Sequence, residues 1–234
     1  MEQFGAGKGR FLAKPFILIM NAHYVASANE FPINIKTAYG ISKIQIWDIR
    51  ALMPVSSMDC GDKVYALDVI DNQAVVGTKD RKVLVWDVRS MKTPLQIRES
   101  PLKFQTRCIK CFPSGEAFVL SSIEGLCLKC HRVKEEVNEL IYPVNSIAFH
   151  PIHRTFATGG SDAIVNMWDP FNRKRLCQFR RFPNSVVSLS FSPEGTLLAI
   201  ASTYMYEEER DDPNSIPESA LAIRRMTDIE VRPK

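Results

Sequence analysis

The chain has 234 residues, of which 45% are hydrophobic and 24% are charged, so it can bury a sizeable core. Its formal net charge of +4 is too small to indicate direct nucleic-acid binding by itself. It has no apolar run of about 18 residues, so we expect no membrane span. Six cysteines in a chain of this length do not indicate a disulfide framework and fit a reducing compartment instead.

Three Trp-Asp pairs recur along the chain at multiples of one unit length. Trp86 follows Trp47 by 39 residues, and Trp168 follows Trp86 by 82 residues, about twice that interval. A period near 40 in which each unit ends in Trp-Asp is typical of WD repeats, so the spacing predicts an all-β WD-repeat β-propeller. Trp47, Trp86 and Trp168 are then structural repeat positions. The doubled interval predicts a unit that has lost its Trp-Asp pair.

The predicted strands follow this repeat in chain order. Residues 1–40 match no unit and form a predicted divergent N-terminal segment, and 41–234 form the partial propeller. Residues 44–47 look like the tail of a blade whose first half is missing or altered. The later units are predicted at 63–69, 74–78 and 83–86; at 107–112, 117–122 and 126–130; at 144–149, 155–159, 164–168 and 175–179; and at 185–191, 196–201 and 219–224. This makes about four to five blades of a seven-blade design, an incomplete propeller.

The unit that ends at Trp168 predicts a buried polar network. Asp162 in a tight turn can accept hydrogen bonds from backbone N–H groups, and Thr158 on the facing strand can accept one from the Trp168 indole. WD repeats often complete this network with a His before the first strand. Tyr142 stands near that position, so we expect the network to be only partial.

Several longer stretches carry a family resemblance. Residues 98–108, 121–125, 129–132, 142–145, 156–162, 168–179 and 198–206 resemble, in the same order, the mitotic checkpoint WD-repeat family named budding uninhibited by benzimidazole three. The resemblance covers about 43–234. The WD-repeat mRNA-export factor of the nuclear pore is similar in some of these stretches, but 168–172 and 175–179 look like the checkpoint family.

This resemblance implies a non-catalytic scaffold that works at kinetochores in the nucleus and also occurs in the cytoplasm. Its implied partners are checkpoint kinases that carry an acidic helical segment, and a kinetochore scaffold phosphorylated on threonine. No membrane or direct nucleic-acid partner is expected. The residues implied for the kinase segment are Lys103, Gln105, Arg107, Arg132 and Tyr142, and the residue implied for the phosphate is Lys129. Arginine presents a planar fork to carboxylates, and lysine presents a point charge to phosphate.

Three departures from the family pattern bear on binding. The first two or three blades are absent, Leu126 stands where the family has an Arg that also contacts the phosphate, and some twenty family residues are missing before Lys129. A lost charge-assisted contact costs about 1.5–3 kcal/mol, so we expect phosphopeptide binding to be weakened at least about tenfold. The alternatives are a nuclear-pore mRNA-export factor and a truncated isoform with impaired binding.

Two pairs of cysteines have the spacing of a four-cysteine zinc site, Cys108 with Cys111 and Cys127 with Cys130. Cys108 and Cys111 lie in one predicted strand, where positions three apart face opposite sides. We therefore expect no metal and no other cofactor. No nucleophile, paired carboxylates or histidine-rich motif stands out, so we expect no enzyme.

The densest basic stretch comprises 173–175 together with Arg180 and Arg181. One interpretation is a set of solvated charges that protect strand edges against aggregation. The other is a recognition patch for an acidic peptide or a nucleic acid. The sequence leaves both open.

Overall fold

The computed structural model describes residues 23–27, 33–38, 42–48, 56–90, 92–126, 130–134, 139–205 and 217–234. Within these ranges nearly all regular structure is β. The strands are β1 (His23–Ser27), β2 (Ile33–Ala38), β3 (Lys43–Asp48), β4 (Ser56–Asp59), β5 (Val64–Ile70), β6 (Gln73–Thr78), β7 (Lys82–Asp87), β8 (Gln96–Glu99), β9 (Thr106–Cys111), β10 (Phe118–Ser122), β11 (Arg132–Lys134), β12 (Glu139–Ile141), β13 (Val144–Phe149), β14 (Phe156–Gly160), β15 (Val165–Asp169), β16 (Lys174–Gln178), β17 (Val186–Phe191), β18 (Leu197–Ser202) and β19 (Ala220–Arg225).

Two short helical turns complete the described elements, a 3-10 turn at Lys79–Arg81 and α1 at Asp228–Val231. No helix in this part of the chain is long and apolar enough to cross a membrane.

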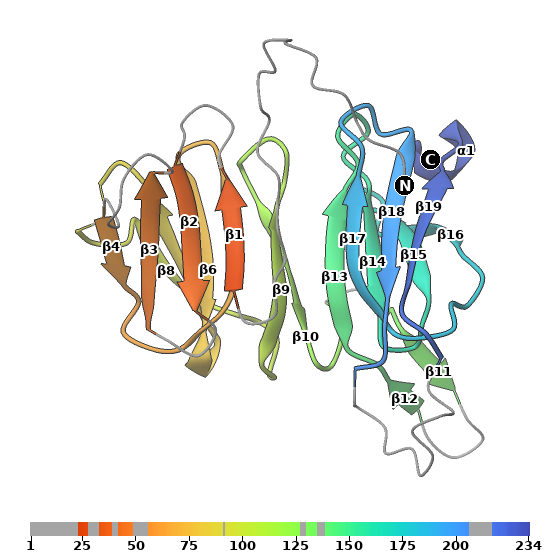
Figure 1. Cartoon of the computed structure of the whole chain (residues 1–234), viewed down its shortest axis with the longest axis horizontal. Helices are drawn as coiled ribbons and strands as arrows, with labels where there is room; N and C mark the ends of the chain where they lie inside the picture. Colours follow the sequence, from red (N-terminus) through yellow and green to blue (C-terminus); the bar gives the residue numbers. More distant parts are fainter. Residues whose placement is uncertain are drawn as a thin grey trace, which may run out of the picture.

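The strands form separate antiparallel sheets that follow one another along the chain (Figure 1). Three sheets have four strands, β1–β4, β5–β8 and β13–β16, whereas β17–β19 has three and β9–β10 only two. The first strands of successive sheets contact one another in the order β1, β5, β9, β13, β17. This is the blade arrangement of a WD-repeat protein and confirms the predicted all-β fold.

The first sheet begins earlier than the repeat pattern indicates. β2 pairs with β3 in the register Ile35↔Ile46, and β1 pairs with β2 in the register Val25↔Lys36. These two strands supply the half blade that the sequence pattern leaves out, so the sheet starts ahead of the boundary predicted at residue 41. Residues 1–22 lie outside the described part of the chain.

The cores lie between the faces of neighbouring sheets. All five residues of β14 are buried, because one face of its sheet packs toward β9 and β10 and the other toward β17 and β18. Gly159 is needed at one such contact, since a Cβ there would lie 2.4 Å from Cγ1 of Val186. Strands buried on both faces are continuously apolar or small, which agrees with the sequence of this unit.

The β9–β10 sheet lacks outer strands in the described part of the chain. A third strand was predicted at 126–130, but Leu126 and Cys130 lie outside any strand, and 127–129 fall outside the described residues. Leu126 and Cys130 instead join the core formed with Val144, Ile147, Phe156 and Trp168.

Candidate peptide-binding site

A cavity of about 590 Å³ lies where loops of three sheets meet. Its walls come from β9, from the segment before β13, from the β14–β15 turn, from the connection between β16 and β17, and from the chain after β18. Its polar lining side chains include Arg107, Tyr142, Arg181, Asn184 and Tyr204. The described lining contains one carboxylate, Asp162, which is engaged within the protein.

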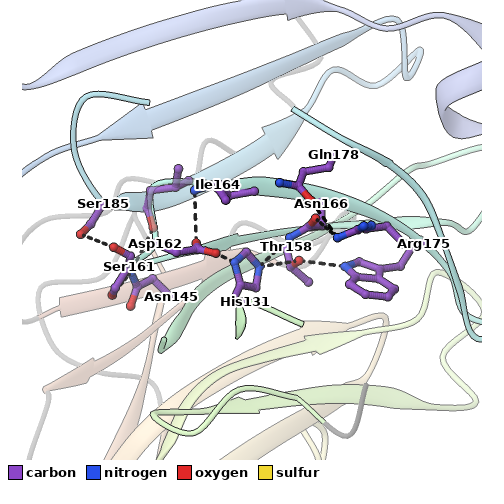
Figure 2. Close-up of polar contacts among 12 residues, drawn as sticks. His131, Asn145, Thr158, Ser161, Asp162, Ile164, Asn166, Arg175, Gln178 and Ser185 are labelled. Atoms are coloured by element: carbon purple, nitrogen blue, oxygen red, sulfur yellow. Dashed lines mark hydrogen bonds and ion pairs between the residues drawn. The ribbon is translucent and has the colours of Figure 1, made fainter. Parts of the chain in front are cut away.

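Arg107 is oriented by a hydrogen bond to a neighbouring sheet. Its Nε donates to Oδ1 of Asn145 at 3.1 Å. Nδ2 of Asn145 in turn donates to Oγ of Ser161 at 3.0 Å and to the Val186 carbonyl at 3.1 Å. Ser185 adds a bond from its Oγ to the Ser161 carbonyl at 3.3 Å (Figure 2). One asparagine therefore connects β9, the β14–β15 turn and β17 at the cavity wall.

Next to the cavity lies a buried chain of hydrogen bonds that is more complete than the sequence predicts. Nε1 of Trp168 donates to Oγ1 of Thr158 at 2.9 Å, which confirms that predicted bond. Nε2 of His131 lies 2.9 Å from the same oxygen, and Nδ1 of His131 lies 2.7 Å from Oδ1 of Asp162 (Figure 2). Asp162 also accepts from the backbone N–H of Ile164, as its position in a turn predicts.

The directions of these bonds follow from their chemistry. The carboxylate can only accept, so Nδ1 of His131 donates, Nε2 accepts the Thr158 hydroxyl proton, and the Thr158 oxygen accepts the indole proton. His131 is 4% exposed, so each of these groups needs its partner. The expectation of a partial network with Tyr142 in the histidine position was wrong. The β11–β12 hairpin lies between His131 and β13. It makes the sequence distance between them longer than the repeat spacing predicts.

The equivalent tryptophan of the second sheet has no such partner. Trp86 is 3% exposed, and its Nε1 makes no hydrogen bond with any described residue. In the same register Val76 stands where the later sheet has Thr158, because Ala74 faces Trp86 as Phe156 faces Trp168. A missing hydroxyl therefore leaves the indole donor unsatisfied. Trp47 lies in β3, and its side chain falls outside the described part.

The structure brings together only some of the residues predicted for partner binding. Arg107 and Tyr142 line the same cavity, joined by Arg181 and Asn184, which the sequence did not single out for this site. Lys103 and Gln105 are exposed on the segment before β9, outside the cavity lining.

Arg132 belongs to the β11–β12 hairpin instead. Its Nη1 donates to Oε2 of Glu139 at 3.0 Å, while its Nε is buried without a hydrogen-bond partner. It does not line the cavity either.

The predicted phosphate site is only partly visible. Lys129 lies outside the described residues. Leu126, at the position where the resemblance implies an arginine, is 7% exposed and packs in the core with Trp168. Its side chain therefore faces the interior and not a ligand.

The cysteine geometry agrees with the prediction that Cys108 and Cys111 face opposite sides of β9. Cys111 packs in the core between β5–β7 and β9, and Cys108 packs toward the core around Trp168. Burial raises the pKa of Cys108 to about 11 and that of Cys130 to about 12, which keeps both as thiols. Within the described residues no three His, Cys, Asp or Glu side chains are grouped to hold a metal ion.

Comparison with known proteins relates this geometry to two groups of relatives. Residues 135–169 match the family model "WD domain, G-beta repeat". The mitotic checkpoint protein bub-3 of Caenorhabditis elegans is 47% identical over 214 residues, which is 82% of this chain and 62% of that protein. The mitotic checkpoint protein BUB3.1 of Arabidopsis thaliana is 42% identical, with the same two coverages of 82% and 62%. Protein RAE1 of Arabidopsis thaliana is 34% identical over 80% of this chain and 57% of its own length. The chain thus spans about 62% of the length of the checkpoint relatives.

Proposed function

We propose that the chain, which is 47% identical to the mitotic checkpoint protein bub-3 of Caenorhabditis elegans over 82% of its length, is a non-catalytic adaptor of the spindle assembly checkpoint. It works at kinetochores in the nucleus and is also present in the cytoplasm. Its partners are checkpoint kinases, and it recruits them by binding a short acidic helical segment in the cavity at Arg107.

The charge of the cavity carries this proposal. Arg107 and Arg181 line it, and the carboxylate of Asp162 is occupied by His131 and the Ile164 backbone. Among its described lining residues the cavity therefore offers two cations to a ligand, and its one carboxylate is already engaged within the protein. Guanidinium groups recognise carboxylates through paired hydrogen bonds, and a site that is already oriented loses less entropy on binding. Tyr142 and Tyr204 supply amphipathic walls suited to a helical turn.

Binding of the phosphorylated kinetochore scaffold is proposed in a weakened form. Lys129 supplies the remaining charge for the phosphate, and the second cation of the family pattern is replaced by the buried Leu126. Loss of one charge-assisted contact costs about 1.5–3 kcal/mol, so the affinity is at least about tenfold lower than with both cations.

The alternative is mRNA export at the nuclear pore, which the similarity to Protein RAE1 supports. That similarity is lower, 34% identity against 47% for the checkpoint relative. We therefore prefer the checkpoint role to mRNA export.

Titration of the full chain with a fluorescent, Glu-rich helical peptide from a checkpoint kinase tests the proposal by anisotropy. We expect saturable binding that Arg107→Gln weakens by about tenfold or more, because one charge-assisted contact is lost. Arg173→Gln is the matched control, since it removes the same charge from an exposed position outside the cavity. Absent binding, or equal affinities for the two variants, would disprove the proposal.

A further inference from the structure

A second cavity of about 420 Å³ adjoins the first between β16 and β19. The two cavities share Arg181, Phe182 and Pro183 as lining residues. The second cavity is also lined by Arg180 and Arg224, and no carboxylate is among its described lining residues. Three arginines in one small cavity make it strongly cationic.

The chain between the two cavities is anchored at both ends. The backbone N–H of Phe179 donates to the Val165 carbonyl at 2.9 Å, and that of Phe182 donates to the Ala163 carbonyl at 2.8 Å. The Phe179 side chain is 5% exposed and lies in the core. Arg180 and Arg181 are the two residues between these anchors, and both are exposed. The fold thus presents two adjacent guanidinium groups on a fixed piece of backbone.

The arginines of this cavity differ in how they are engaged. Arg224 stacks over the Phe179 ring, 4.0 Å from its centroid, and forms an ion pair with Glu230. Arg175, earlier in the same basic stretch, donates to Oε1 of Gln178 at 2.7 Å. The side chains of Arg180 and Arg181 make no hydrogen bond or ion pair with any residue of the described chain. No described residue therefore neutralises these two charges, whereas Arg224 is already partly neutralised by Glu230.

We infer that the two cavities form one anion-binding tract, in which a ligand segment in the first cavity crosses Arg181 and places a second anionic group against Arg180. That group is a carboxylate or a phosphate, because both present oxygens that fit a guanidinium fork. Phe179 and Phe182 line the tract and limit the water that competes with a ligand for the arginines. The inference rests on the proposed function, since the segment that crosses the tract is the acidic segment of the partner. Of the two interpretations of the basic stretch, this inference favours a recognition patch at Arg180 and Arg181.

Two probes test the tract on the full chain, inorganic tripolyphosphate by calorimetry and the acidic kinase peptide by anisotropy. The peptide is used with its terminal residue as Glu, phosphoserine or Gln. We expect Arg180→Gln to weaken tripolyphosphate and the Glu and phosphoserine peptides by about three- to tenfold, as for one exposed charged contact. The affinity for the Gln peptide should be the same with and without Arg180→Gln. Arg173→Gln, with the same charge change on an exposed turn, should leave all affinities unaltered, and a larger effect on phosphoserine than on Glu would identify phosphate as the preferred group.

The outcomes separate this inference from the proposed function. Peptide binding that depends on Arg107 but is insensitive to Arg180→Gln overturns the tract and leaves the adaptor role standing. Tripolyphosphate binding that is lost in Arg180→Gln, without any peptide binding, supports the anion site and rejects the adaptor role. Equal losses of affinity in Arg180→Gln and Arg173→Gln would mean that net charge alone governs binding, and this would overturn the tract.

Discussion

Oδ1 of Asn145 accepts a hydrogen bond from Nε of Arg107 at 3.1 Å, across the boundary between two sheets. The same asparagine donates to Ser161 and Val186, so the orientation of Arg107 is tied to the packing of three sheets. A surface arginine normally samples many rotamers, and that freedom is lost when it binds a ligand. Here the fold itself supplies part of this ordering.

Asn145→Ala should therefore lower both the stability and the affinity for an acidic peptide. It removes three hydrogen bonds from a partly buried position, which costs about 1–3 kcal/mol of unfolding free energy. Peptide affinity should fall by about three- to tenfold as Arg107 loses its orientation. Urea unfolding and anisotropy measure the two effects. Ser185→Ala is the control, because it deletes one bond at the same cavity without touching Arg107; equal affinity losses in both variants would contradict this role of Asn145.

The two described core tryptophans should respond differently to loss of the indole N–H. Trp168→Phe removes the donor bonded to Thr158, whereas Trp86→Phe removes a donor that has no partner. We expect Trp168→Phe to cost about 1 kcal/mol more in unfolding free energy than Trp86→Phe. Val76→Thr should supply an acceptor for the Trp86 indole. In that background Trp86→Phe should cost nearly as much unfolding free energy as Trp168→Phe. Denaturant unfolding of the single variants and of the Val76→Thr/Trp86→Phe double variant measures these free energies. If Val76→Thr changes the unfolding free energy equally with Trp86 present and in the Trp86→Phe background, the added hydroxyl does not bond the indole and the explanation is refuted.

Stability should decrease at mildly acidic pH because of His150. Its Nδ1 accepts from the backbone N–H groups of Ile152 and His153, and its Nε2 donates to the Gly195 carbonyl. Burial, followed by the charge of His153, lowers the pKa of His150 below its usual value of 6.5, so the folded protein favours the neutral ring.

The sign of this effect follows from proton linkage. Below about pH 6.5 the unfolded chain binds a proton at this histidine while the folded chain does not, so stability falls by up to about 1.4 kcal/mol per pH unit. The loss continues until the pH reaches the lowered pKa. Unfolding free energies between pH 7.5 and 5.5 should show a smaller slope in His150→Gln than in the unaltered protein. An identical slope in both would exclude His150 as the source.

The sequence predicts the strands best where the repeat is regular. The pattern places strands at 144–149, 155–159 and 164–168, and β13, β14 and β15 follow these within a residue. In contrast, β1 and β2 carry no turn motif and no Trp-Asp pair. They are placed by the pairing of β2 with β3 and of β1 with β2, which no Trp-Asp spacing predicts. His131 was missed for a related reason, since a hairpin changes its distance from β13.

The site was predictable only in part. Arg107 and Tyr142 lie 35 residues apart, and their common cavity depends on how three sheets meet, which spacing alone does not reveal. The family resemblance indicated both residues. Arg180 and Arg181 could be noticed as a basic pair, but their availability depends on backbone anchors at Phe179 and Phe182. The absence of an acceptor for Trp86 could have been found by aligning Val76 with Thr158.

The burial of Leu126 also limits how this chain can change over evolution. The side chain is 7% exposed and sits against Val144 and Trp168, so a codon change to arginine would place an unpaired guanidinium in a packed interior. Selection for stability would remove such a variant before its phosphate affinity could be tested. Placing a cation at this position therefore requires new backbone that carries residue 126 to the surface, as well as the substitution.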